Sequence, residues 1–231
     1  LNSNLNILNI SLAKKNAELL KAKQLASSYP SLDLDFYLKN SESDSNSSVD
    51  DYSSYGTILT FKSSLLRNKS EDAFSEVTLF KSWTINDVIG HLHIFNHAAE
   101  CSLQSVESFD NFFTPIAERL KEGISLVEAQ RPWLKNLSGL ELLDNWWEGS
   151  KDLANKYKGT DPKKRLKWAG PEMSARSSVT ARQMETWAHG QELFDVFLEK
   201  RVEHNRLKNI AHLGVSTFGW TFLNRKWPVP K

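Results

Sequence analysis

The chain has 231 residues with nearly balanced charge, since 29 basic residues stand against 28 acidic ones and the net charge is +1. A domain that binds nucleic acid usually carries a basic stripe, so this composition argues against a nucleic-acid partner. The single cysteine excludes an internal disulfide and a cysteine-rich metal cluster, so any metal must be held by histidines and carboxylates.

No stretch of the sequence has the pattern of a leader peptide or a membrane span. The first ten residues lack basic side chains, and asparagines interrupt their apolar residues. Apolar runs stay well below the roughly 18 residues that a membrane span needs. We therefore expect a cytoplasmic protein with no membrane partner.

Residues 1–50 are predicted to form an N-terminal extension. Leucines at helical spacing over residues 5–27 indicate one amphipathic helix. Residues 40–51 are rich in serine and aspartate and offer too little apolar surface to bury, so we predict a linker there. We expect the extra helix to pack on the main domain rather than to bind a partner.

Residues 51–203 have the pattern of a helical bundle. Thr84, with Asp87 three positions later, comes close to a capping box and predicts that a helix begins there. Apolar periodicity and end signals predict helices over residues 58–66, 84–105, 108–122, 138–157 and 177–200. Several helices joined by short loops are typical of an all-α bundle.

Two shorter segments complete the predicted organisation, one before the last helix of the bundle and one at the C-terminal end of the chain. Residues 166–175 are predicted to be an extended piece punctuated by Gly170 and Pro171, and no β-hairpin is evident. Residues 204–231 are predicted to add a helix over 206–224, which the following WPVP stretch ends.

Glu185 and His189 stand four residues apart in the helix predicted over residues 177–200. Four residues turn a helix by about 400° and advance it by roughly 6 Å, so the two side chains project from one face. A catalytic zinc site typically uses two histidines, one carboxylate and an open position. The third ligand must therefore come from another helix.

Three histidines in the helix predicted over residues 84–105 are candidates for this third ligand. At about 100° per residue, His91 lies about 90° from the centre of the apolar face and His97 lies much further away. His91 has the best geometry, but its margin over His93 is small and periodicity alone does not decide between them.

A second interpretation of the same stripe needs no metal. Arg182, Glu185, His189 and Glu192 follow one another at spacings of three, four and three, which is also the pattern of an exposed row of ion pairs worth a few tenths of a kcal/mol. Against this, apolar residues occupy most of the helix circumference: Met184, Trp187, Ala188, Leu193, Phe194 and Phe197. The spacing alone leaves both interpretations open.

The segments SWTINDVIGHL (82–92) and ARQMETWAHGQE (181–192), in this order, resemble the mycothiol-dependent maleylpyruvate isomerase group of the DinB-like four-helix bundles. The resemblance covers roughly residues 55–225. Trp83, Arg182 and the WAGPEMSA stretch (168–175) fit an actinobacterial-type branch of that group.

The resemblance implies a DinB-like four-helix bundle that binds a divalent metal through His91, Glu185 and His189. Arg182 and Glu192 would then orient these ligands or form salt bridges beside them, although Glu192 stands where the family usually has Asp. Family members continue into a small C-terminal α/β domain, so the resemblance also implies that residues 204–231 hold only the start of a truncated domain.

By the same resemblance, the expected function is a thiol-dependent isomerase or S-transferase that acts on a small electrophilic molecule. The implied cofactors are a divalent metal, with Zn expected first, and a low-molecular-weight thiol such as mycothiol as cosubstrate. The alternative is a bundle that binds a metal or ligand without catalysis. A role in wyosine formation in tRNA is a remote alternative, because one cysteine cannot ligate the iron–sulfur cluster that radical chemistry requires. The sequence identifies no catalytic residue beyond the metal ligands and no oligomeric state.

Overall fold

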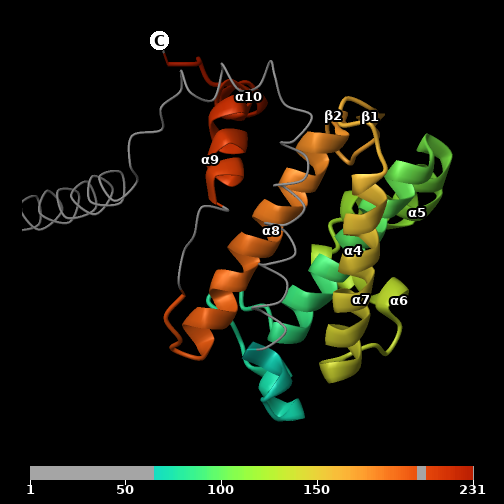
Figure 1. Cartoon of the computed structure of the whole chain (residues 1–231). Coiled ribbons are helices and arrows are strands. Elements are labelled where there is room, and N and C mark those ends of the chain that lie inside the picture. The colour runs from blue at the N-terminus through green and yellow to red at the C-terminus, as the bar shows by residue number, and fades with distance from the viewer. Residues whose placement is uncertain (1–64, 202–206, 231) are drawn as a thin grey trace, which may run out of the picture. The chain divides into compact units, whose positions relative to one another are not determined.

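The computed structural model describes residues 65–201 and 207–230, which all belong to one compact unit, Asn46–Lys231 (Figure 1). The predicted N-terminal helix, the predicted linker and most of the helix predicted over 58–66 lie outside these residues. The predicted domain boundaries after residues 50 and 203 therefore stay predictions.

Helices make up most of the described chain. In chain order the elements are η1 (Glu71–Ser75, a 3-10 helix), α4 (Ile85–Gln104), α5 (Val106–Lys121), α6 (Leu126–Leu134), α7 (Gly139–Lys158), β1 (Arg165–Leu166), β2 (Met173–Ser174), α8 (Ala175–Val196), α9 (Leu207–Ser216) and α10 (Phe218–Asn224). No helix in this part of the chain is long and apolar enough to cross a membrane.

Helix α4 begins where the capping box was predicted. The Asp87 backbone N–H donates to Thr84 Oγ1 at 3.1 Å, and the Thr84 backbone N–H donates to the Asp87 carboxylate at 2.9 Å. These two bonds satisfy N–H groups that a helix start leaves without partners, so the entry into α4 is fixed.

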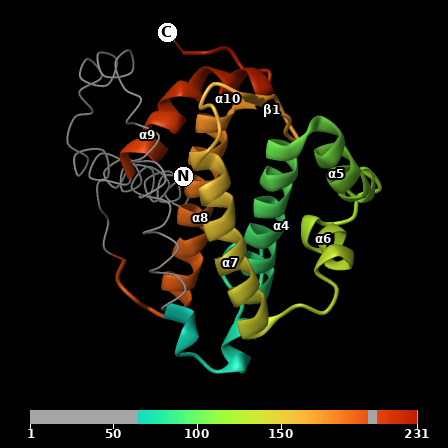
Figure 2. The ribbon, with the colours of Figure 1, turned by 45° about the vertical axis from the view of Figure 1, so that its right-hand side comes forward.

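The long helices α4, α7 and α8 lie side by side, and α5 and α6 pack on α4 (Figure 2). The main core lies at the contact of α4 with α7 and includes Ile85, Val88, Leu92, Leu142, Leu143 and Trp146. A second cluster, with Leu153, Tyr157 and Val179, joins α7 to α8. Because α4 contacts all of these helices, one of its faces is held against α8 and another against α6.

Three elements differ from the predictions. Helix α6 was not predicted, and the helix expected over 206–224 is two helices that meet at Thr217, outside helical geometry at φ −98° and ψ 3°. The extended piece holds a short antiparallel pair in which Arg165 faces Ser174 and Leu166 faces Met173, so the prediction of no β-hairpin was wrong. The fold class is unaffected, because this pair has two residues in each strand.

Candidate metal centre

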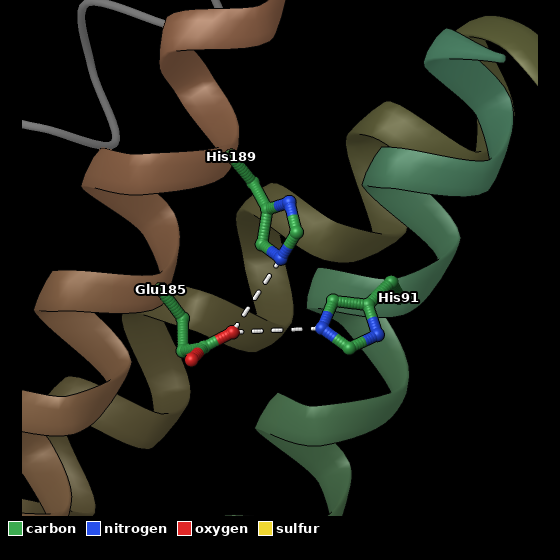
Figure 3. Close-up of side chains that lie close together, drawn as sticks. All are labelled: His91, Glu185 and His189. Atoms are coloured by element: carbon green, nitrogen blue, oxygen red, sulfur yellow. Dashed lines mark ion pairs between the residues drawn. The ribbon is translucent and has the colours of Figure 1, made fainter. Parts of the chain in front are cut away.

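The structure brings His91 of α4 together with Glu185 and His189 of α8 (Figure 3). The Nε2 atoms of both histidines lie 3.5 Å from the same carboxylate oxygen, Oε2 of Glu185. One donor atom from each residue lies within 4.8 Å of the other two, and among the described residues no other group of three His, Cys, Asp or Glu side chains meets this condition. Two imidazoles and one carboxylate form a donor set that suits zinc and related divalent ions.

Aromatic rings surround the two imidazoles. The Trp83 ring stacks on His189 at 5.8 Å between centroids, and Phe80 meets the same imidazole edge-on at 5.2 Å. Phe95 lies 4.7 Å from the His91 ring. These contacts fix the orientation of both imidazoles and leave only 8 and 12% of the His91 and His189 side chains exposed.

The other ring nitrogen of His91 also has a partner. Gln130 of α6 is 1% exposed, and its side-chain nitrogen lies 3.4 Å from His91 Nδ1. Gln130 was missed by sequence reasoning because α6 itself was not predicted. The clue was a polar residue three positions before Trp133, on the side of α6 that packs on α4.

Two groups of the site, the Glu185 carboxyl and the His91 imidazole, have shifted pKa values. Burial alone would raise the pKa of Glu185, but the hydrogen bonds from His189 and His91 and the charge of Arg182 together lower it well below its usual range. The pKa of His91 is lowered chiefly by burial, against the raising effect of its hydrogen bond with Glu185. At neutral pH the carboxylate is therefore ionised and the His91 imidazole neutral, which are the states that metal binding requires.

Arg182 lies on α8 one turn before Glu185 and is only 4% exposed. Its guanidinium carbon lies 5.2 Å from the ring centroid of Trp168 and 5.6 Å from that of Phe95. Among the described residues its Nε and Nη1 have no hydrogen-bond partner. Glu192, on the next turn after His189, is partly exposed and lies outside the group of three.

The remaining candidates on α4 point elsewhere. His93 packs against Trp133 at 5.2 Å, and burial together with the nearby His97 lowers its pKa to about 4. His97 packs against Phe112 at 4.7 Å and Trp133 at 5.1 Å. The choice that periodicity left open therefore falls on His91, because of the three histidines only His91 joins the group with Glu185 and His189.

Comparisons with known proteins agree with this architecture. Two uncharacterized proteins of Mycobacterium tuberculosis are each 33% identical to the chain over 159 residues, which is 69% of this chain and 61% of theirs. The chain thus spans about three fifths of the length of these relatives.

The crystal structure of a mutant of the mycothiol-dependent maleylpyruvate isomerase has the same fold, with a TM-score of 0.55 at 14% identity over 78% of this chain and 73% of that one. This likeness confirms the predicted all-α, DinB-like fold class. Residues 59–194 match the family described as the mycothiol maleylpyruvate isomerase N-terminal domain. This match covers more than half of the chain, so the chain belongs to the mycothiol maleylpyruvate isomerase N-terminal domain family.

Proposed function

We propose that His91, Glu185 and His189 bind one divalent metal ion. We further propose that the protein with this ion bound is a thiol-dependent isomerase or S-transferase that acts on a small electrophilic molecule. The observation that carries the proposal is the meeting of three donor side chains from two helices far apart in the sequence. Membership of the family supports the thiol as cosubstrate.

The chain's own residues match this chemistry. A bound divalent ion lowers the pKa of a thiol or water ligand and makes it a nucleophile near neutral pH. Three protein ligands leave a position free for that group, as in catalytic zinc sites. Phe80, Trp83 and Phe95 line the imidazoles and keep bulk water away from them, which strengthens electrostatic interactions at the site.

Metal content measured by elemental analysis tests the first half of the proposal. We expect about one ion per chain, with Zn as the expected metal, and loss of this ion in the variants Glu185→Gln and His189→Gln. Asp195→Asn, at an exposed carboxylate on the same helix, is the matched control and should keep the metal. Circular dichroism checks that all three variants retain the helical signal, and a Glu185→Gln protein that keeps its metal refutes the assignment.

Turnover tests the second half. The metal-loaded protein is assayed with mycothiol, bacillithiol and glutathione and a panel of small electrophiles, and thiol consumption is followed. We expect turnover with at least one thiol and none in His189→Gln. Stoichiometric metal without turnover for any thiol would instead support a non-catalytic metal-binding bundle.

A further inference from the structure

The geometry points to an anion subsite at Arg182, so that the ligand of this site carries a carboxylate in addition to the group that reaches the metal. The inference rests on the proposed function and names the chemical class of its ligand. Three observations lead to it: the burial of Arg182, the charge of the site, and the position of Phe95 between Arg182 and His91.

Arg182 is buried without an adequate partner. Two aromatic rings, those of Trp168 and Phe95, lie against its guanidinium group. Such cation–π contacts stabilise the charge but accept no hydrogen bond from the N–H groups. Because a buried donor without an acceptor destabilises the folded protein, we take these N–H groups as the place where a ligand supplies the acceptor.

The charge of the site requires an anion once a divalent ion is bound. Without the ion, the ordinary charges of the Arg182 guanidinium and the Glu185 carboxylate are opposite and cancel. A divalent ion leaves two positive charges in a largely buried site, which is unfavourable at low dielectric. A thiolate removes one of them, and one carboxylate removes the other. A phosphate group, with nearly two negative charges, would leave an excess.

The distances fit a small ligand. Arg182 precedes Glu185 by three residues on the same face of α8, so one helical turn, roughly 5 Å, separates them along the axis. Phe95 touches both ends of this span, since its ring lies 4.7 Å from the His91 ring and 5.6 Å from the Arg182 guanidinium carbon. In a ligand that joins a metal-binding group to a carboxylate by a short carbon chain, this chain would lie against the Phe95 ring.

Access to Arg182 runs past Trp168. This side chain is partly exposed and belongs to the connection between β1 and β2, where the next two residues, Ala169 and Gly170, are exposed. It also lines an open pocket of about 330 Å³ with Phe109 and Phe113. The Trp168 side chain thus touches both this pocket and the Arg182 guanidinium group.

The test compares two thiols that differ only in the group at the end opposite the sulfur, which is a carboxylate in one and an amide in the other. The affinities of the metal-loaded full chain for 3-mercaptopropionate and 3-mercaptopropionamide are measured by calorimetry. We expect the acid to bind at least about tenfold more tightly than the amide, as a charge-assisted hydrogen bond predicts. In Arg182→Met this ratio should fall to about one, and in Arg182→Lys part of it should remain.

Arg131→Met removes an exposed arginine of α6 and serves as the matched control, in which the ratio should not change. Metal content and circular dichroism are measured for every variant. Equal affinities in the metal-loaded wild type, no binding of the acid, or a ratio that survives in Arg182→Met each overturn the inference while leaving the metal site intact. Failure of the proposed function is distinguishable, because the wild type would then hold no metal or would show no turnover with any thiol, whatever the ratio of the two affinities.

Discussion

At the scale of single residues, Gln130 is the side chain that contacts the second ring nitrogen of His91, and we expect it to orient this ring for the proposed metal. Nε2 of His91 lies 3.5 Å from Glu185 Oε2 and Nδ1 lies 3.4 Å from the Gln130 amide nitrogen, distances that fit a neutral ring donating through Nε2 and accepting at Nδ1. With a metal on Nε2 the proton would lie on Nδ1 and would need an acceptor, and the amide oxygen of Gln130 would supply it after a half turn of the amide. We expect Gln130→Met to weaken metal affinity by about 10- to 100-fold, measured by competition with a chromophoric chelator.

Two further variants separate orientation of His91 from simple packing. Gln130→Glu keeps an acceptor for the Nδ1 proton and should restore the affinity lost in Gln130→Met. Gln104→Met, on the exposed end of α4, should leave the affinity unchanged. Wild-type affinity in Gln130→Met, or failure of Gln130→Glu to restore it, would show that Gln130 only fills space.

Some residues of this site could be predicted from the sequence, and others could not. Glu185 and His189 share one helix, so spacing alone placed them on one face, and the structure brings them together. The choice between His91 and His93 depends on which neighbouring helix each faces, and helical periodicity contains no such information. Arg182 was expected to orient the ligands or form a salt bridge, and the contacts that the structure gives it are two aromatic rings.

At the scale of elements, the capping box of α4 determines how firmly the helix that carries His91 is anchored. Thr84→Ala removes the side-chain acceptor for the Asp87 N–H. We expect the free energy of unfolding to fall by about 1 kcal/mol, the usual cost of losing an N-cap. Urea denaturation followed by circular dichroism measures the change.

Helix α7 offers a matched control for this prediction. Its N-cap residue, Ser138, makes no side-chain capping hydrogen bond. Ser138→Ala should therefore leave the free energy of unfolding nearly unchanged. A loss as large as that of Thr84→Ala would mean that a generic effect of the serine or threonine side chain, and not the capping box, is being measured.

The elements that sequence reasoning missed share a physical cause. Helix α6 is nine residues long and contains Pro132, so its apolar pattern is too short and interrupted to register as a helix. The break at Thr217 lies in a segment whose apolar spacing continues from α9 into α10, and the local backbone geometry rather than the pattern ends the first helix. Helix α4 was located within one residue at each end, whereas α8 begins two residues and ends four residues before its predicted bounds.

At the scale of the whole molecule, the site is a consequence of how α4 packs. Its contacts with α7 bury the main core, and its contacts with α6 and α8 aim His91 at Glu185 from one side and at Gln130 from the other. The all-α class followed from periodicity and loop length, whereas the pairing of α4 with α8 followed only from the family resemblance. Pairing of distant helices is decided by tertiary contacts, which a single sequence does not display.

Because the three proposed ligands come from two helices, metal binding should stabilise the entire fold. A ligand that binds only the folded state adds about 2.7 kcal/mol at a free concentration one hundred times its Kd. We expect Zn²⁺ to raise the Tm by several degrees in differential scanning calorimetry and a chelator to reverse the rise. Glu185→Gln should show no metal-dependent rise, since its remaining two imidazoles bind the ion far more weakly. An equal rise in Glu185→Gln would mean that the ion stabilises the chain from another site.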